Sequence, residues 1–299
     1  MGKDTMIPKR VFYMWLGSAK PIDVNLCFLS WQNCLKEYEL IEINENKSKY
    51  FDFMQECKRN SFFDFVYRNK MWAYVADYVR CFVLEKFGGI WLDTDVSLYK
   101  NFDEFLGYGL FLGRSMESYQ HIETALIGAK AHHPVIAEML QFYQKEIWRS
   151  SFYTGPRIAT YVLQKYGFSA KEDGGIITNG DIAVYPPKYF YPFNCDDAFE
   201  PSCITDKTVA IHWWKSSWSR PEIINWLKRD RLKGEKKSAG KFIASEVKFY
   251  LFGFLPFISY YPSQNLIKVF SLSLAKIKKY RTKTKAMLFN FIPLCKWRG

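Results

Sequence analysis

The feature that most constrains the fold is an alternation of short apolar segments with helical segments in the N-terminal third of the chain. Strand-like runs at 10–17 ("RVFYMWLG") and 38–44 ("YELIEIN") flank a helical segment at about 22–35. A second helical segment at about 71–87 leads into a third strand-like run, "IWLDTDV" at 90–96. Strand, helix, strand, helix, strand is the βαβ pattern of an α/β sheet, so the chain is predicted to have an α/β fold.

The third strand-like run leads directly into two carboxylates, Asp93 and Asp95. Alternate side chains of an extended segment point the same way, so both carboxylates face one side of the strand end. Like charges this close need a cation, a shared proton or open water. Because ligands of α/β sheets bind beyond the carboxyl ends of the strands, we expect the pair to share a rim with Trp15, at the end of the first strand. Taken alone, an Asp-x-Asp sequence is also typical of a solvated strand end followed by a turn.

The net charge of +12 belongs to the C-terminal quarter of the chain. Residues 1–225 carry 25 Lys and Arg against 27 Asp and Glu, a net charge of −2, whereas residues 226–299 carry 17 against 3, a net charge of +14. We therefore predict two regions, a domain at 1–225 and a basic extension at 226–299. No nucleic-acid-binding motif accompanies the charge, which argues against a nucleic-acid partner.

The basic extension contains a pattern typical of an amphipathic helix. The apolar residues at helical spacing are Leu266, Ile267, Phe270, Leu274 and Ile277, and the cations beside or opposite them are Lys268, Lys276, Lys278, Lys279 and Arg281. Basic amphipathic helices lie at the headgroup boundary of anionic membranes. The pattern predicts a helical extension that binds an anionic membrane surface. The alternative is a helix packed on the domain with a solvated basic face.

The cysteines and the N-terminal sequence favour the cytoplasm. The seven cysteines, an odd number, show no CxxC spacing and are expected to be reduced thiols. The N-terminus lacks the long apolar stretch of a secretory signal peptide. The longest apolar run, Phe249–Tyr261, is short for a membrane span and contains Gly253 and Pro256. We expect a cytoplasmic protein that associates peripherally with the cytoplasmic face of the membrane.

Five segments, taken in order, resemble one family of enzymes. The string "MWAYVADYVRCFVLEKFGGIWLDTDV" (71–96) resembles glycosyltransferases with a DXD sugar-binding region, the OCH1-like and capsular-polysaccharide enzymes of glycosyltransferase family 32, and more distantly the glucosylating domain of the large clostridial toxins. The other four segments are "IPKRVFYMWLG", "IETALIGAKAHHP", "TGPRIAT" and "IHWWKSSW". Each segment alone is a weak signal, but the ordered set is specific, and the resemblance covers roughly residues 6–220.

The resemblance implies a GT-A-like single domain in which helices flank a mostly parallel central sheet that binds a nucleotide sugar. It implies that Asp95 binds Mn²⁺ or Mg²⁺ directly, and that Asp93 contacts the ribose or sugar and the metal shell. A divalent cation would neutralise the charge of the departing diphosphate. His212 is implied as a third metal ligand. The alternative for His212 is a hydrogen-bonded histidine of the core.

The resemblance also assigns residues to the donor. Trp15 would stack on the nucleobase. Asp77 and Arg80 would hold sugar hydroxyls and bridge to the phosphate side, although two such residues three apart on a helix are as typical of a surface ion pair. Ser217 and Trp218 would donate hydrogen bonds to the β-phosphate or the glycosidic oxygen, where charge develops.

The implied reaction moves a hexose from a nucleotide sugar, with UDP favoured by analogy, to a glycan acceptor. The capsular relatives suggest an acceptor that is a lipid-linked capsule or surface polysaccharide intermediate. The family retains the anomeric configuration, and a retaining glycosidase would use a carboxylate nucleophile. No residue is an evident nucleophile. Glu123 is expected in a strand that faces the cleft, but a simple surface carboxylate is the favoured interpretation. We therefore expect front-face transfer, in which the departing phosphate helps to deprotonate the acceptor hydroxyl.

Two other functions fit part of the sequence. The run "IWLDTDVS" nearly matches the motif of haloacid-dehalogenase-like phosphatases, in which Asp93 would be the phosphorylated nucleophile and Asp95 a general acid. Its position after two βα units, and Ser97 at the final motif position, argue against this reading. A non-enzymatic membrane-surface module that binds sugars fits the basic extension and the aromatic content of 19%, but leaves the ordered segments unexplained.

Overall fold

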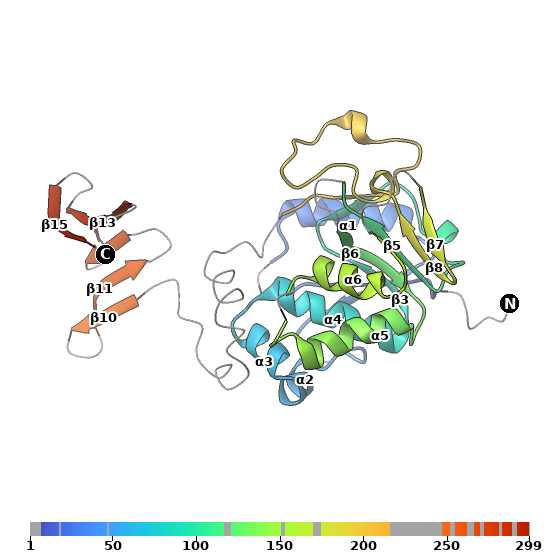
Figure 1. The fold of residues 1–299 in the computed structure, drawn as a ribbon, viewed down its shortest axis with the longest axis horizontal. Helices are drawn as coiled ribbons and strands as arrows, with labels where there is room; N and C mark the ends of the chain where they lie inside the picture. The colour runs from blue at the N-terminus through green and yellow to red at the C-terminus, as the bar shows by residue number, and fades with distance from the viewer. Residues whose placement is uncertain are drawn as a thin grey trace. The chain divides into compact units, whose positions relative to one another are not determined.

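The computed structural model describes residues 7–17, 19–46, 48–116, 121–150, 153–169 and 175–215, together with six C-terminal strands between 247 and 298. These residues form two compact units, an α/β domain and a C-terminal sheet (Figure 1). Within the described residues, no helix is long and apolar enough to cross a membrane.

The α/β domain is built on a seven-stranded sheet with the order β2-β1-β3-β6-β5-β8-β7. The strands are β1 (Arg10–Met14), β2 (Glu39–Ile43), β3 (Gly89–Leu92), β5 (Leu110–Arg114), β6 (Ile122–Ala129), β7 (Ile177–Asn179) and β8 (Ile182–Tyr185). Strands β2, β1, β3, β5 and β8 run in one direction, whereas β6 and β7 run in the other. The predicted α/β class with a mostly parallel central sheet is confirmed.

Helices cover this sheet and frame its edges. They are α1 (Ile22–Cys34), α2 (Phe53–Arg59), α3 (Ser61–Arg68), α4 (Trp72–Phe87), α5 (Pro134–Gln141) and α6 (Gly155–Gln164). Helix α4 packs on β1, β3 and β6, and α6 packs on β6. Helix α4 ends at Gly88, whose φ of 64° lies in the left-handed region that glycine adopts at low cost. The chain can therefore turn at once into β3.

A second, two-stranded sheet lies beside the end of β3. It pairs β4 (Val96–Leu98) with β9 (Ala210–His212) in antiparallel register, with Val96 opposite His212. Helix α1 packs on β4, and the Trp31 indole N–H donates to the Val96 carbonyl at 2.7 Å. This small sheet joins the chain just after the Asp pair to a segment more than a hundred residues further on.

The described part of the C-terminal unit is a β-sheet and not the predicted helical extension. The described segments are the strands β10 (Val247–Leu251), β11 (Leu255–Tyr261), β12 (Leu266–Val269), β13 (Leu272–Tyr280), β14 (Lys283–Leu288) and β15 (Ile292–Arg298). They pair in sequence order as an antiparallel sheet. The helix prediction was wrong because short apolar runs broken by polar residues fit a helical and an extended period almost equally well. The proposed boundary after residue 225 stays a prediction.

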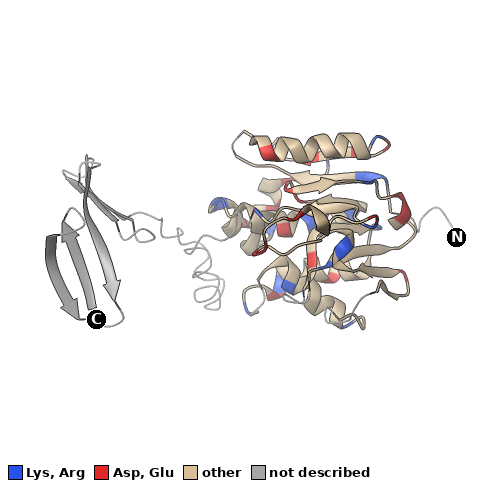
Figure 2. Cartoon of the chain, turned by 90° about the horizontal axis from the view of Figure 1, so that it is seen from above, with Lys and Arg blue, Asp and Glu red and all other residues tan. Residues whose placement is uncertain are grey.

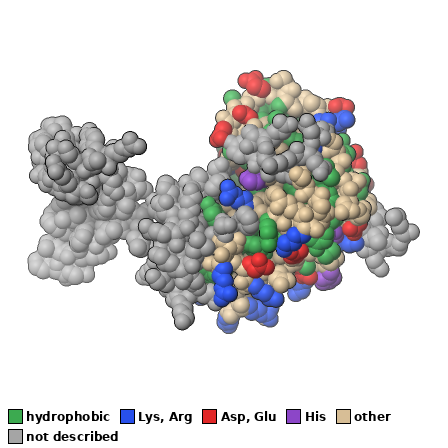
Figure 3. Space-filling view, in the orientation of Figure 1, with side chains coloured by type: hydrophobic (Ala, Val, Ile, Leu, Met, Phe, Trp, Pro, Cys, Tyr) green, Lys and Arg blue, Asp and Glu red, His purple; other side chains and the backbone are tan. Residues whose placement is uncertain are grey.

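Charge on the α/β domain is mixed. Figure 2 shows Lys and Arg interspersed with Asp and Glu over the elements of this unit, as expected from the near-neutral count for residues 1–225. On the face shown in Figure 3, hydrophobic side chains are scattered among polar ones. On the described part of the face shown in Figure 3, charges of both signs therefore lie together.

The sheet is closely packed where β5 meets β6. Gly128 of β6 lies directly opposite Phe111 of β5. The fully buried Phe111 ring is held by Phe105 and Phe190, with ring centroids at 5.3 and 6.2 Å. A Cβ atom at position 128 would overlap the Phe111 ring, which has no free space to move into.

We expect Gly128→Ala to lower the free energy of unfolding by about 1–3 kcal/mol, the usual cost of overpacking a filled core. The matched control is Gly107→Ala, because a Cβ atom there meets nothing within 4 Å. The control should change stability by less than about 0.5 kcal/mol. Urea unfolding of both variants measures the difference, and equal midpoints would contradict the packing argument.

Candidate functional site

The site begins where the buried strand β3 ends in Asp93. The Asp93 N–H donates to the Ala125 carbonyl at 2.8 Å, which extends the pairing of β3 with β6 by one residue. The Val96 N–H then donates to the Asp93 carbonyl at 3.1 Å, so the chain turns tightly before β4 begins. Both carboxylates are thus carried on backbone that two sheets hold in place.

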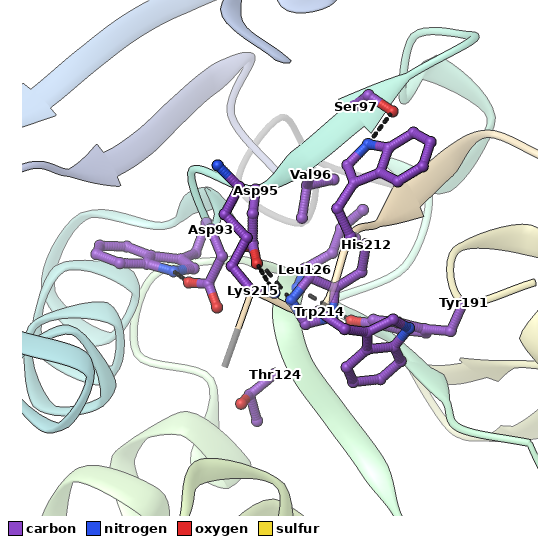
Figure 4. A network of polar contacts seen from close by, with 12 residues as sticks. Asp93, Asp95, Val96, Ser97, Thr124, Leu126, Tyr191, His212, Trp214 and Lys215 are labelled. Carbon is purple, nitrogen blue, oxygen red and sulfur yellow. Dashed lines mark hydrogen bonds and ion pairs between the residues drawn. The ribbon is translucent and has the colours of Figure 1, made fainter. Parts of the chain in front are cut away.

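Asp95 is anchored by the segment that ends β9. Its Oδ1 lies 3.3 Å from His212 Nε2, and its Oδ2 accepts from the Lys215 N–H at 3.0 Å (Figure 4). Its carbonyl accepts from the Trp213 N–H at 2.9 Å. Burial acts to raise the pKa of Asp95, but the charge and hydrogen bond of His212 and the Lys215 N–H outweigh it and lower the pKa to about 2. Asp95 is therefore charged at any physiological pH.

His212 also packs against two aromatic rings. The Trp214 ring centroid lies 4.2 Å from that of the imidazole, and the Tyr191 ring lies at 5.9 Å, nearly perpendicular. Trp214 has a φ of 53°, an unfavourable conformation for a residue with a Cβ atom. Burial would lower the pKa of His212, but Asp95 raises it above its ordinary value. The buried Nδ1 atom of His212 has no hydrogen-bond partner among the described residues.

Asp93, Asp95 and His212 together form a set that fits a divalent cation. Each offers one ligand atom, and these atoms all lie within 4.8 Å of one another. Two carboxylates and an imidazole suit metals such as Mn²⁺. The structure thus brings together Asp95 and His212, which the resemblance implied as metal ligands, and Asp93, which it assigned to the donor and the metal shell. Metal binding itself stays a prediction.

Arg80 links Asp93 to the sheet. Its Nη2 lies 2.8 and 3.2 Å from the two Asp93 oxygens, and the Trp91 indole N–H donates to Asp93 Oδ1 at 2.7 Å. The Arg80 Nη1 donates to the Thr124 carbonyl. Burial raises the pKa of Asp93, and the neighbouring Asp95 adds to this, whereas Arg80 lowers it; the net direction is upward.

Asp77 completes this group from helix α4. Its Oδ1 lies 3.3 Å from Arg80 Nη2, and its Oδ2 accepts from the Gly155 N–H at the start of α6, at 3.1 Å. Burial raises the pKa of Asp77 to about 6, against the opposing charge of Arg80. The Arg80 side chain is only 4% exposed. The interpretation of this pair as an ordinary surface ion pair was therefore wrong.

Position 155 requires glycine because the side chains of Thr124 and Asp77 lie very close to its backbone. A Cβ atom at this position would lie 2.6 Å from Thr124 Oγ1 and 2.7 Å from Asp77 Oδ1, closer than atoms can pack. A glycine lets the first turn of α6 bring its backbone N–H against the Asp77 carboxylate. This explains the Gly-Pro start of the segment "TGPRIAT".

The prediction that Glu123 is a surface carboxylate was wrong. It lies on β6, is 5% exposed, and faces surroundings that include Ser115, Arg80 and His212. Burial raises the pKa of Glu123 to about 7, partly opposed by the charges of His212 and Arg80. The sequence signal for this burial is an acid near the start of a strand whose other residues, apart from Thr124, are apolar.

The remaining predicted residues fall in two groups. Trp15 follows β1, the direct neighbour of β3 in the sheet, and its N–H donates to the Ile43 carbonyl at 3.3 Å. It therefore lies on the same rim of the sheet as Asp93, as predicted, whereas its role in base stacking stays a prediction. Ser217 and Trp218 lie outside the described residues.

The sequence of residues 21–111 matches a protein family described as "Glycosyltransferase sugar-binding region containing DXD motif". This range includes Asp77, Arg80, Asp93 and Asp95. A curated relative, "Uncharacterized glycosyltransferase L373" from Acanthamoeba polyphaga mimivirus, is 26% identical over 221 residues, which cover 72% of this chain and 84% of the relative.

Solved structures with some similarity include three glycosyltransferases. PaToxG glycosyltransferase is 18% identical with a TM-score of 0.42, covering 54% of this chain and 69% of its own. A glycosyltransferase involved in glycosylation of the major capsid of PBCV-1 is 12% identical with a TM-score of 0.36 (77% and 99% covered). The galactosyltransferase LgtC, in complex with donor and acceptor sugar analogues, is 10% identical with a TM-score of 0.37 (77% and 93% covered).

The family match covers both DXD carboxylates and the Asp77–Arg80 pair that the structure joins to them. It confirms the predicted enzyme class against the phosphatase and the non-enzymatic alternatives. The predicted enzyme class, a glycosyltransferase, is confirmed, and residues 21–111 are similar to the DXD sugar-binding region of that family.

Proposed function

We propose that this glycosyltransferase moves a hexose from a UDP-linked donor to a glycan acceptor, depends on Mn²⁺ or Mg²⁺, and retains the anomeric configuration. The observation that carries the proposal is the set of Asp93, Asp95 and His212 ligand atoms within 4.8 Å of one another at the end of β3. A cation held there would supply positive charge opposite the diphosphate leaving group.

In this proposal, Asp95 and His212 are the ligands that anchor the cation. Because the pKa of Asp95 is about 2, its carboxylate is charged throughout the neutral range. The β4–β9 pairing sets His212 next to it independently of any ligand. Such preorganised groups need no rearrangement when charge develops on the leaving phosphate.

Asp77 and Arg80 orient the donor sugar in this proposal. Arg80 is fixed by oxygen atoms of three residues, Asp77, Asp93 and Thr124, so its guanidinium presents donors from a rigid position. Ser217 and Trp218 would donate to the departing phosphate, and Trp15 would stack on the base. We propose front-face transfer, in which the leaving phosphate accepts the proton of the acceptor hydroxyl.

We further propose that the acceptor is a lipid-linked glycan met at the cytoplasmic face of a membrane. The support is the net charge of +14 on residues 226–299. Each Lys or Arg near an anionic surface contributes about 1 kcal/mol to binding, whether it is carried on a helix or on a strand. The change from helix to strands therefore removes the predicted geometry but leaves the electrostatic reason for attachment.

Asp95→Asn tests the metal site. The amide keeps the shape of the side chain but removes a charged ligand, so Mn²⁺-dependent hydrolysis of UDP-hexoses should fall by at least ~10²-fold, the scale of one lost electrostatic group. The assay is release of UDP from a panel of nucleotide sugars, with and without Mn²⁺ and EDTA. A wild-type rate that EDTA leaves unchanged would refute metal dependence.

The pKa of Asp77 predicts an acid limb in the pH profile of kcat/KM. Its pKa is raised to about 6, so protonation below that pH removes the charge opposite Arg80, and kcat/KM should fall about tenfold per pH unit. Rates measured between pH 5 and 8 give the profile. Asp77→Asn should be slow and should lose the limb near pH 6, and a wild-type profile without that limb would contradict the assignment.

The membrane proposal predicts salt-sensitive binding to anionic vesicles. The full chain should co-sediment with phosphatidylserine-containing vesicles at low salt and be released at high salt, because screening weakens each contact. A truncation that ends near Lys241 should bind more weakly because it lacks part of the cationic region. Equal binding of both proteins, or none by the full chain at low salt, would remove the membrane role.

A further inference from the structure

Two buried polar groups beside the candidate metal site can form contacts beyond those described above. The Nδ1 atom of His212 is buried and has no hydrogen-bond partner among the described residues. The Glu123 carboxylate is 5% exposed and is hydrogen-bonded to the Ser115 side chain, which occupies only part of its capacity to accept hydrogen bonds. Buried polar groups nearly always have partners, so an unmatched nitrogen near a carboxylate that can accept further hydrogen bonds suggests a contact between them.

The structure links these groups through Tyr191. The Tyr191 ring lies edge-on to the His212 imidazole, with centroids 5.9 Å apart. Its hydroxyl oxygen accepts from the Leu126 N–H at 3.1 Å, on β6, three residues from Glu123. The charge of Glu123 acts to raise the pKa of Tyr191, and the charge of His212 acts to lower the pKa of Glu123. The three side chains therefore share one buried region.

The other nearby carboxylates are already committed. Asp95 faces the opposite ring nitrogen, Nε2, at 3.3 Å. Asp93 accepts from Arg80 and from Trp91. This leaves Glu123 as the carboxylate available to Nδ1. A histidine that binds a metal through one nitrogen usually donates the other N–H to a carboxylate, a carbonyl or a water, and this contact fixes the tautomer and the ring orientation.

We propose that Glu123 is a positioning residue, whose carboxylate accepts the Nδ1–H hydrogen bond of His212, directly or through one bound water, and so directs Nε2 toward Asp93, Asp95 and the cation. The proposal rests on the metal site of the proposed function. It adds a residue from the centre of the sheet to a site whose ligands come from β9 and from the end of β3. It also explains why an acidic side chain is buried on β6.

Mn²⁺ affinity of the full chain, measured by isothermal titration calorimetry, tests the proposal. Glu123→Leu removes the acceptor and should weaken Mn²⁺ binding by about 10–100-fold, the usual cost of losing such a partner. Glu123→Gln keeps an oxygen acceptor without the charge and should weaken binding less than Glu123→Leu does. The matched control is Glu56→Gln, because Glu56 is another 5% exposed acid. It is hydrogen-bonded to the Tyr78 hydroxyl, and no described contact joins it to His212 or the Asp pair.

The control should bind Mn²⁺ within about twofold of wild type, as expected for a residue outside the ligand shell. A Glu123→Leu variant that binds Mn²⁺ as wild type does would overturn the proposal. If wild type itself binds no Mn²⁺, the metal-dependent function fails instead, and the Glu123–His212 contact is then decided by a second measurement.

That second measurement is nitrogen-15 NMR of the imidazoles, which is practical because the chain has 4 histidines. In wild type, with or without Mg²⁺, His212 should carry a slowly exchanging Nδ1–H proton. Glu123→Gln should shift this proton and speed its exchange, whereas Glu56→Gln should not. A His212 that lacks the Nδ1 proton, or an Nδ1–H that Glu123→Gln leaves unchanged, refutes the contact even if Glu123→Leu fails to fold.

Discussion

The site depends on the balance between four buried or half-buried carboxylates and two cationic side chains. Each of four acids interacts electrostatically with Arg80, with His212 or with both: Asp77, Asp93, Asp95 and Glu123. Such a concentration of acids is tolerated only because each cation is shared. The same excess of negative charge makes a divalent cation a favourable addition, because it would be placed among ligands that are already desolvated and fixed.

One guanidinium joins the fold to the site. Arg80 leaves helix α4, contacts Asp93 at the end of β3, and donates to the Thr124 carbonyl of β6. Its position on the face of the Trp91 ring, 5.5 Å from the centroid, adds a cation–π contact. Removing one partner of a buried charged group costs far more than a surface pair would, since the remaining charges stay buried. The packing of α4 on the sheet and the geometry of the candidate site therefore cannot vary independently.

Sequence reasoning reached the parts of the molecule that local patterns determine. The βαβ alternation and the Asp93–Asp95 spacing are short-range features, and both were found as predicted. The meeting of Asp95 with His212 spans more than a hundred residues and was accessible only through the family resemblance. The burial of Glu123 depends on what covers β6, which no local pattern encodes. The C-terminal strands were missed because apolar and basic residues at short spacing do not decide between helix and sheet.

The carboxylates of the site differ in their electrostatic surroundings, and this difference suits them to different tasks. Asp95, with His212 and a backbone N–H beside it, has a pKa of about 2 and keeps its charge at neutral pH. Glu123 is buried, which raises its pKa to about 7 although the charges of His212 and Arg80 act to lower it. In the proposed reaction, the repulsion that an entering diphosphate meets would be smaller if one of the four acids took up a proton. Asp95 would then remain a charged ligand for a cation while the total charge of the site adjusts to an anionic donor, and the different surroundings of the two acids would set this division of roles.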